Sequence, residues 1–311
     1  MPGRCRGAAA ALLVLLVSAT VGCGSSGESA RATTTTSTAS TTSPAEAVRS
    51  PVVGERATIR YPDHGRPPFP TVVLVHGGAF TEGDRDDPHL DVVGARFRAA
   101  GYATASVDYR LGTGIPAELA RYRETTGTDY SCDPDLPATG AEAPDDPGGP
   151  GRPCLVYLRV IADASEDLHA ALADLRRDGP RLDLRTDRLA LYGESAGSTL
   201  VIGAAVDPGE AGGVVAVVGV ASGAQVPAGR STAKVLLVTY ADAAVELPDL
   251  VGPNQQAVLR EDVAALRDRG AEADLLELPG RGHVPEAGTA DLDLLIERSV
   301  QLYRRAGLGG G

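Results

Sequence analysis

The residue with the clearest chemical potential is Ser195, in the pentapeptide Gly193-Glu194-Ser195-Ala196-Gly197. A serine flanked by glycines at this spacing fits a tight turn between a strand and a helix, where its hydroxyl can act as a nucleophile. With 38 glycines in the chain, the pentapeptide alone is weakly specific. Apolar segments at 188–192 and 199–206 supply a candidate strand and helix. We therefore interpret Ser195 as a candidate nucleophile; the alternative is a glycine-rich turn in a structural protein.

A second candidate element is His76-Gly77-Gly78-Ala79-Phe80, directly after the apolar run 71–75. Acyl transfer places negative charge on a carbonyl oxygen, and a backbone N–H group aimed at that oxygen contributes roughly 3 kcal/mol. Two adjacent glycines let the backbone turn its amides inward. The expected donors are Gly78, Ala79 and Ala196, with Gly77 as a close alternative. His76 is expected to orient this loop by hydrogen bonding rather than to act as a base.

A serine nucleophile needs a general base, and the chain has five histidines: His64, His76, His89, His169 and His283. His283 follows Gly280-Arg281-Gly282 in a loop after the last apolar run, 273–278. Its position after Ser195 matches the order serine, acid, histidine that is typical of one large group of hydrolases. His169 lies in a helical pattern, and His64 and His89 lie in polar loops. The sequence therefore favours His283.

The third member of such a triad is a carboxylate, which holds the imidazole in one tautomer and stabilises the imidazolium. It is expected on the loop after the apolar run 234–240. Asp242 lies at the end of that run and is the favoured residue, while Asp249 and Glu246 are alternatives on the same loop.

Short apolar runs alternate with amphipathic segments through the body of the chain. Runs without strict alternation are typical of strands covered on both faces. The expected strands are 71–75, 103–107, 188–192, 214–220, 234–240 and 273–278, and the expected helices are 91–100, 165–177, 199–206, 255–269 and 290–305. This alternation predicts an α/β domain over residues 51–308, with a mostly parallel central sheet flanked by helices. Residues 112–155 interrupt it as an insertion.

The first 23 residues have the pattern of an export signal. Arg4 and Arg6 precede the apolar run 8–17, which is too short to span a bilayer. The end of the segment, Thr20-Val21-Gly22-Cys23, resembles a bacterial lipoprotein signal, although Thr20 stands where leucine is usual. The resemblance implies that Cys23 is lipidated and holds the protein on the outer face of the bacterial cell membrane; an ordinary secretory signal is the alternative. Residues 24–50, rich in Thr and Ser, predict a disordered tether.

The cysteines outside the signal form one candidate pair. Cys5 is removed with the signal and Cys23 is the lipidation candidate, so Cys132 and Cys154 remain. In an oxidising compartment an even pair favours a disulfide, here across a segment dense in Pro, Gly and Asp. Closing such a loop contributes roughly 3 kcal/mol. A redox or metal site is the alternative, and no Cys-x-x-Cys spacing supports it.

The net charge of −12 argues against a nucleic-acid partner, because phosphate binding needs a cationic face. The histidines form no ligand-spaced pairs and no nucleotide fingerprint is present, so neither a metal nor a cofactor is implied. The sequence leaves the oligomeric state open.

Together the motifs resemble the α/β-hydrolase fold, and within it the esterase/lipase groups with an HGG oxyanion motif. These are the hormone-sensitive-lipase-like and BD-FAE-like esterases and, more distantly, type-B carboxylesterases. The resemblance covers residues 57–304 and includes Asp108-Tyr109-Arg110-Leu111 and Asp242-x-x-Val245. Ala79 departs from it by replacing a third glycine, and so does Ser198, where a further glycine is frequent. Asp108 and Arg110 resemble the structural pair near the site in these groups and have no expected catalytic role.

The resemblance implies a serine carboxylesterase that hydrolyses small esters through Ser195, Asp242 and His283 and an acyl-enzyme. Two alternatives remain open. A prolyl-type serine peptidase shares the triad but usually carries a large gating domain, for which this chain is short. A cell-surface binding lipoprotein on the same fold would have lost its catalytic site. Activity toward esters and peptide amides distinguishes the three.

Overall fold

The computed structural model of the chain describes residues 52–53, 56–112, 152–207, 209, 212–221, 226, 228–243 and 255–309. Side chains are not described for residues 52–53, 152–159, 242–243 and 255. The described residues belong to the unit Val48–Gly311. The expected signal and tether with Cys23, most of the insertion with Cys132, and the alternatives Glu246 and Asp249 lie outside them.

The described strands form one eight-stranded sheet with the order β1-β2-β4-β3-β5-β6-β7-β8. The strands are β1 (Val52–Val53), β2 (Ala57–Arg60), β3 (Phe69–Val75), β4 (Ala103–Val107), β5 (Leu184–Glu194), β6 (Val214–Val220), β7 (Lys234–Ala243) and β8 (Glu272–Gly282). Pairing is antiparallel at β1–β2 and β2–β4 and parallel in every pair from β4 to β8. The predicted mostly parallel sheet is confirmed, and its parallel strands end at one common edge.

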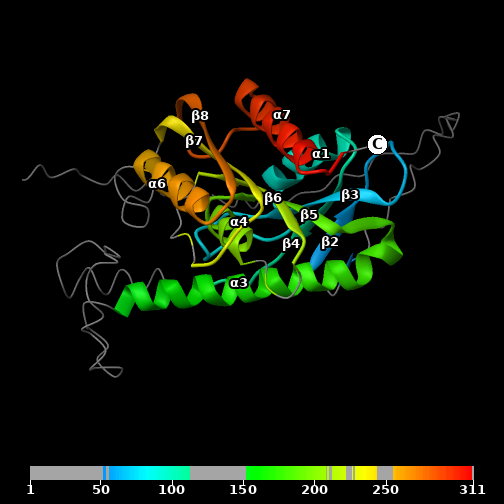
Figure 1. Cartoon of the computed structure of the whole chain (residues 1–311), viewed down its shortest axis with the longest axis horizontal. Helices are drawn as coiled ribbons and strands as arrows, with labels where there is room; N and C mark the ends of the chain where they lie inside the picture. Colours follow the sequence, from blue (N-terminus) through cyan, green and yellow to red (C-terminus); the bar gives the residue numbers. More distant parts are fainter. Residues whose placement is uncertain are drawn as a thin grey trace, which may run out of the picture. The chain divides into compact units, whose positions relative to one another are not determined.

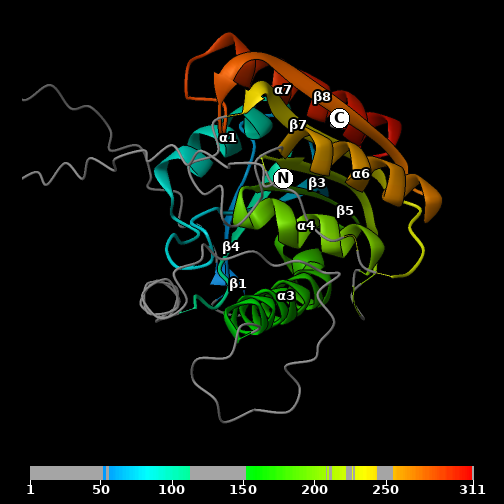
Figure 2. The ribbon, with the colours of Figure 1, turned by 90° about the vertical axis from the view of Figure 1, so that its left-hand side faces the viewer.

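Helices cover both faces of this sheet. They are α1 (Pro88–Ala99), α3 (Arg152–Asp178), α4 (Ala196–Val206), α6 (Gln255–Asp268) and α7 (Ala290–Arg305), with a short 3-10 helix, η2 (Gly179–Leu182). Figures 1 and 2 show α1 and α7 on one side of the sheet and α3, α4 and α6 on the other. Among the described residues, no helix is both long and apolar enough to cross a bilayer.

The alternation of side chains along β3 shows why both faces are covered. Val72 and Leu74 are buried in the core formed with α1 and α7, whereas Val73 and Val75 are buried in the core formed with α3, α4 and α6. Successive side chains of a strand point to opposite faces, so an unbroken apolar run supplies both cores at once. The prediction that the run 71–75 forms a strand covered on both faces is confirmed.

Three helices begin earlier than predicted. The start of α4 is Ala196 instead of residue 199, because the helix follows the Ser195 turn directly. The start of α1 is Pro88 instead of residue 91, because the side chain of Asp87 accepts a hydrogen bond from the Leu90 amide at 2.9 Å and Pro88 fits the first helical turn. The start of α3 is Arg152 instead of residue 165. Cys154 therefore lies within the backbone of a helix, not in an irregular insertion, and residues 113–151 are the part of the expected insertion outside the described residues.

Candidate active site

Ser195 occupies the one-residue turn between β5, which ends at Glu194, and α4, which begins at Ala196. Its backbone has φ 50° and ψ −117°, an unfavourable conformation for a residue with a side chain. Backbone hydrogen bonds hold this turn: the Ser195 amide donates to the carbonyl of Val220 at 2.8 Å, and the carbonyl of Ser195 accepts from the amides of Ser198 at 2.9 Å and Thr199 at 3.4 Å. This is the strand–turn–helix context that the pentapeptide predicts.

The two glycines of the pentapeptide are required by close backbone contacts. A Cβ atom on Gly193 would lie 2.3 Å from the carbonyl oxygen of Gly197. A Cβ atom on Gly197 would lie 2.3 Å from the carbonyl oxygen of Val75 and 2.5 Å from that of His76. The nucleophile turn is therefore packed, backbone against backbone, onto the end of β3.

The HGG loop lies beside the nucleophile because β3 and β5 are neighbours, with Val75 opposite Gly193. A Cβ atom on Gly77 would lie 3.3 Å from the Cβ atom of Ser195. After Gly77 the backbone turns sharply, with φ 100° at Gly78, 50° at Ala79 and 61° at Phe80. The structure thus brings the loop and the nucleophile together, as predicted.

The expected oxyanion donors have N–H groups that are available to a ligand. Within the described residues, the amides of Gly77, Gly78, Ala79 and Ala196 donate no hydrogen bond. The carbonyl of Gly78, in contrast, accepts from the amides of Thr81 at 2.9 Å and Glu82 at 3.1 Å. A set of unpaired N–H groups beside a serine is suited to binding an oxyanion.

His76 has the loop-orienting geometry that we expected. It is 2% exposed, and its Nδ1 donates to the carbonyl of Gly77 at 2.8 Å. The imidazole stacks on the ring of Tyr109, with centroids 4.2 Å apart and an interplanar angle of 11°. Burial lowers the pKa of His76, which favours the neutral ring.

The candidate acid and base lie at the ends of two neighbouring strands. In the β7–β8 pair, Asp242 is opposite Arg281 and Ala243 is opposite Gly282, which directly precedes His283. Asp242 and His283 are thus offset by two residues at the edge of the sheet where β3 and β5 also end. His283 is half-buried, and its Nδ1 atom is buried. The hydrogen bonds of the triad itself remain a prediction.

Tyr240 contributes to the histidine side of the site in a way that the sequence did not suggest. A Cβ atom on Gly282 would lie 2.6 Å from the ring of Tyr240, so this ring lies flat on the residue before His283. Burial, with a hydrogen bond to Asp291, raises the pKa of Tyr240 to about 12. The ring of Tyr240 therefore connects the strand that carries Asp242 to the loop that carries His283.

Glu194, directly before the nucleophile, is a buried carboxylate with two side-chain partners. It is 6% exposed and accepts hydrogen bonds from the Tyr192 hydroxyl at 2.5 Å and from Nε2 of His89 at 3.3 Å. The hydrogen bond to Glu194 raises the pKa of His89. His89, which we expected to lie in a polar loop, is instead in the first turn of α1 and joins that helix to the end of β5.

Asp108 and Arg110, expected as a structural pair, are not bonded to each other in the described part of the chain, and each has a different partner. Asp108 accepts from the Arg85 amide at 2.7 Å. The side chain of Arg110 donates to Asp167 of α3 at 2.7 Å. These contacts connect the end of β4 to the segment before α1 and to α3. His169 also has a structural contact, because its Nε2 lies 2.9 Å from the carbonyl of Asp207.

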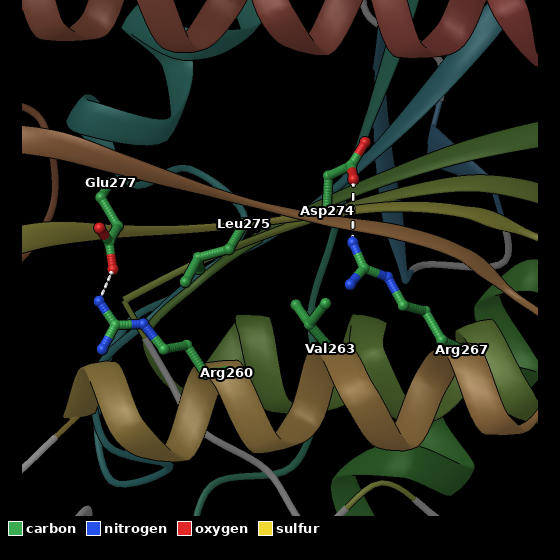
Figure 3. Close-up of a pocket in the computed structure, with 6 residues that line it drawn as sticks. All are labelled: Arg260, Val263, Arg267, Asp274, Leu275 and Glu277. Carbon is green, nitrogen blue, oxygen red and sulfur yellow. Dashed lines mark hydrogen bonds and ion pairs between the residues drawn. The ribbon is translucent and has the colours of Figure 1, made fainter.

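A surface hollow between α6 and β8 is separate from these residues. Figure 3 shows its six lining residues, Arg260, Val263, Arg267, Asp274, Leu275 and Glu277. Ion pairs join Arg260 to Glu277 and Arg267 to Asp274 across it. It contains no nucleophile and lies along β8 before the end of the strand, so we assign it no part in the chemistry. No group of three metal-ligating side chains occurs in the described residues.

Comparisons with known proteins agree with this architecture. The BD-FAE family model matches residues 58–120, which include the HGG loop. No curated protein sequence matches the chain significantly.

Several solved structures of an esterase from the planctomycete Thermogutta terrifontis are similar to this chain. The native esterase 2 has a TM-score of 0.54 and 14% identity over 81% of this chain and 88% of that chain. The propionate-bound form has a TM-score of 0.54 and 13% identity over 82% and 90%. The form phosphoramylated by tabun has a TM-score of 0.54 and 12% identity, again over 82% and 90%. The chain therefore has the α/β-hydrolase fold that its motifs predicted.

Proposed function

We propose that this protein is a serine carboxylesterase that hydrolyses small carboxylic esters through an acyl-enzyme on Ser195. One observation carries the proposal. The strained turn at Ser195 is packed against the HGG loop, and the amides of Gly78, Ala79 and Ala196 donate to no other group in the described part of the chain. A nucleophile next to preorganised N–H donors is the arrangement that acyl transfer requires.

In the proposed mechanism, His283 removes the proton of the Ser195 hydroxyl as the oxygen attacks the ester carbonyl. Asp242 orients the imidazole and stabilises the imidazolium. The backbone amides hold the oxyanion, and His283 then protonates the alcohol as the C–O bond breaks. Water, deprotonated by His283, hydrolyses the acyl-enzyme and releases the acid.

The comparisons support this proposal and suggest a substrate size. The similar Thermogutta esterase 2 has been solved with bound propionate and with bound butyrate. We therefore propose short-chain esters as substrates of this chain.

The test uses the full-length protein with p-nitrophenyl acetate, p-nitrophenyl butyrate and a fluorophosphonate probe. The wild type should hydrolyse both esters and be labelled once, while Ser195→Ala should do neither. Ser198→Ala, one turn further into α4, is the matched control and should keep both activities. A wild type without labelling or hydrolysis would contradict the proposal and favour a binding protein. Preferential cleavage of peptide amides would instead favour a prolyl-type peptidase.

We propose that the enzyme is exported and held to the membrane by acyl chains on Cys23. The sequence pattern of residues 1–23 supports this location, because stable anchoring needs more than one acyl chain and a lipoprotein cysteine carries several. Mass spectrometry of the mature N-terminus should find a lipidated Cys23, and Cys23→Ser should release the protein. Cleavage at another position would contradict the anchor.

A disulfide between Cys132 and Cys154 is a further proposal for the exported protein. Peptide mapping without reduction should find these cysteines in one linked pair. Two free thiols in the secreted protein would contradict it.

A further inference from the structure

Tyr109, two residues beyond β4, contacts the HGG loop from the neighbouring strand. Its hydroxyl lies 3.0 Å from the carbonyl oxygen of His76 and 3.0 Å from that of Gly77, and it donates to this pair of consecutive carbonyls. The residue is 6% exposed. Its ring stacks on His76 and packs against Phe80 with centroids 5.9 Å apart. The side chain is therefore held in place by both ends of the loop that it contacts.

These two contacts fix the direction of two peptide groups. In a planar trans peptide, the C=O of one residue and the N–H of the next point in opposite directions. The carbonyls of His76 and Gly77 both point toward the Tyr109 hydroxyl. The amides of Gly77 and Gly78 must therefore point away from it.

We propose that Tyr109 is the positioning residue of the oxyanion hole, and that its hydroxyl sets the direction of the Gly77 and Gly78 amides. The inference rests on the proposed ester hydrolysis and adds to it the residue that determines which amides face the substrate. Tyr109 touches neither the substrate nor Ser195 in this account, since it acts through the peptide groups of the loop.

The rest of the loop does not need Tyr109. The Ala79 amide and the Gly78 carbonyl belong to the same peptide group. This carbonyl accepts hydrogen bonds from the amides of Thr81 and Glu82, which lie in the same turn, so its direction does not depend on Tyr109. His76 supports the Gly77 carbonyl with its Nδ1–H group. Among the described residues, the Gly77 carbonyl therefore has two side-chain donors, whereas the His76 carbonyl has one, Tyr109. Loss of the Tyr109 hydroxyl should therefore make the direction of the Gly77 and Gly78 amides less well defined, while the Ala79 amide remains in place.

The kinetic consequence distinguishes a positioning role from a merely structural one. The oxyanion exists in the transition state and not in the bound ester, so misdirected amides lower kcat and leave KM nearly unchanged. Removal of a whole oxyanion donor lowers kcat by about 100- to 1000-fold. A loosened hole should lose less than that.

The experiment compares Tyr109→Phe with Tyr303→Phe in the full-length protein. Tyr303 is a matched control because it is also buried and its hydroxyl donates to a backbone carbonyl, that of Leu191, at 3.2 Å, away from the loop. Steady-state kinetics with p-nitrophenyl butyrate gives kcat and KM. Melting temperature and the extent of fluorophosphonate labelling report folding.

We expect Tyr109→Phe to be labelled fully by the fluorophosphonate. Its kcat should fall about tenfold or more, with KM within twofold of the wild-type value. Its affinity for a trifluoromethyl ketone, an inhibitor that forms an oxyanion, should fall by a similar factor. Tyr303→Phe should keep the wild-type kcat at a lower melting temperature. A wild-type kcat in Tyr109→Phe, or an equal loss in Tyr303→Phe, would overturn the inference and leave the esterase proposal standing. A wild type that neither labels nor turns over would overturn both. If Tyr109→Phe does not fold, a crystal structure of the wild type with the trifluoromethyl ketone bound decides the question. Its oxyanion must lie within hydrogen-bond distance of the Gly77 or the Gly78 amide, and an oxyanion that contacts neither amide would overturn the inference.

Discussion

The two sides of the site are built in different ways. On the serine side, backbone lies against backbone: Gly193 faces the carbonyl of Gly197, and Gly197 faces the carbonyl of Val75. On the histidine side, the contact is between the ring of Tyr240 and Gly282. Backbone atoms of a packed strand or helix cannot move aside, whereas a side chain can adopt another rotamer at moderate cost. A methyl group added to a glycine on the serine side should therefore prevent correct packing. A methyl group added on the histidine side should be accommodated by a shift of the Tyr240 ring.

The largest effect is expected from Gly193→Ala. The added Cβ would lie 2.3 Å from a carbonyl oxygen, so the free energy of unfolding should fall by more than about 4 kcal/mol, or the protein should not fold. Gly203→Ala, on α4, is the control, because nothing lies within 4 Å of its added Cβ. In a helix interior this change should stabilise by about 1 kcal/mol. Urea denaturation measures both, and equal stabilities would contradict the comparison.

Gly282→Ala should have a smaller effect, because the neighbouring atoms belong to the Tyr240 ring. We expect a loss of about 1–3 kcal/mol in stability, as for other overpacked sites, together with a lower kcat as the His283 loop shifts. Tyr240→Leu should restore part of both losses in the double variant. Purely additive losses, measured by urea denaturation and ester turnover, would show that the ring is not the obstacle.

The His89–Glu194 contact, which reaches the serine side from α1, predicts a pH-dependent stability. Its hydrogen bond raises the pKa of His89, so the folded protein binds this proton more tightly than the unfolded chain. The resulting stability is fully present below about pH 6.5 and is lost as the pH rises through the raised pKa. His89→Gln should therefore destabilise the protein by about 1 kcal/mol more at pH 5.5 than at pH 9.

The pH dependence of stability that His76 contributes should have the opposite sign to that of His89, which gives a check on this prediction. Burial lowers the pKa of His76, so its contribution is present above the unfolded pKa and is lost as the pH falls toward the lowered value. Urea denaturation at several pH values gives the free energy of unfolding and distinguishes the contributions of the two histidines. An effect of His89→Gln that is equal at pH 5.5 and pH 9 would rule out the charged contact with Glu194.

The smallest effect is expected from Ser198→Ala. The Ser198 hydroxyl is buried and has no hydrogen-bond partner among the described residues, so its removal should stabilise by about 1 kcal/mol, or 2–4 °C in Tm. Ser299 on α7 is the matched control, because its buried hydroxyl donates to the carbonyl of Leu295 at 2.7 Å. Ser299→Ala should give no such gain. A lower Tm for Ser198→Ala would indicate that its hydroxyl is satisfied.

Most of the architecture could be predicted because it depends on local patterns. The apolar runs 103–107 and 214–220 match β4 and β6 residue for residue. The Ser195 turn and the HGG loop carry their own glycines, which made them visible in the sequence. The early start of α1 was missed because Asp87-Pro88 was assigned to a polar loop, although an N-cap aspartate followed by proline is a signal for the start of a helix.

Apart from His76, which lies in the HGG motif itself, the supporting residues of the site could not be predicted, because they act between elements distant in the chain. Tyr109 contacts carbonyls 32 and 33 positions earlier, and His89 contacts Glu194 across 105 positions. Only the packing of β4 and α1 against the ends of β3 and β5 brings these side chains together. Neither composition nor spacing indicates which buried tyrosine or histidine supports a site.

The most direct test of the account is a crystal structure of the full-length protein after reaction with a fluorophosphonate. We predict a phosphorus–oxygen bond to Ser195 Oγ, with the phosphonyl oxygen about 2.7–3.1 Å from the amide of Ala196 and from at least one amide of the HGG loop. The loop itself should not move, because its carbonyls are already held by Tyr109, His76, Thr81 and Glu82. An adduct on another residue, or a phosphonyl oxygen that faces away from these amides, would contradict it.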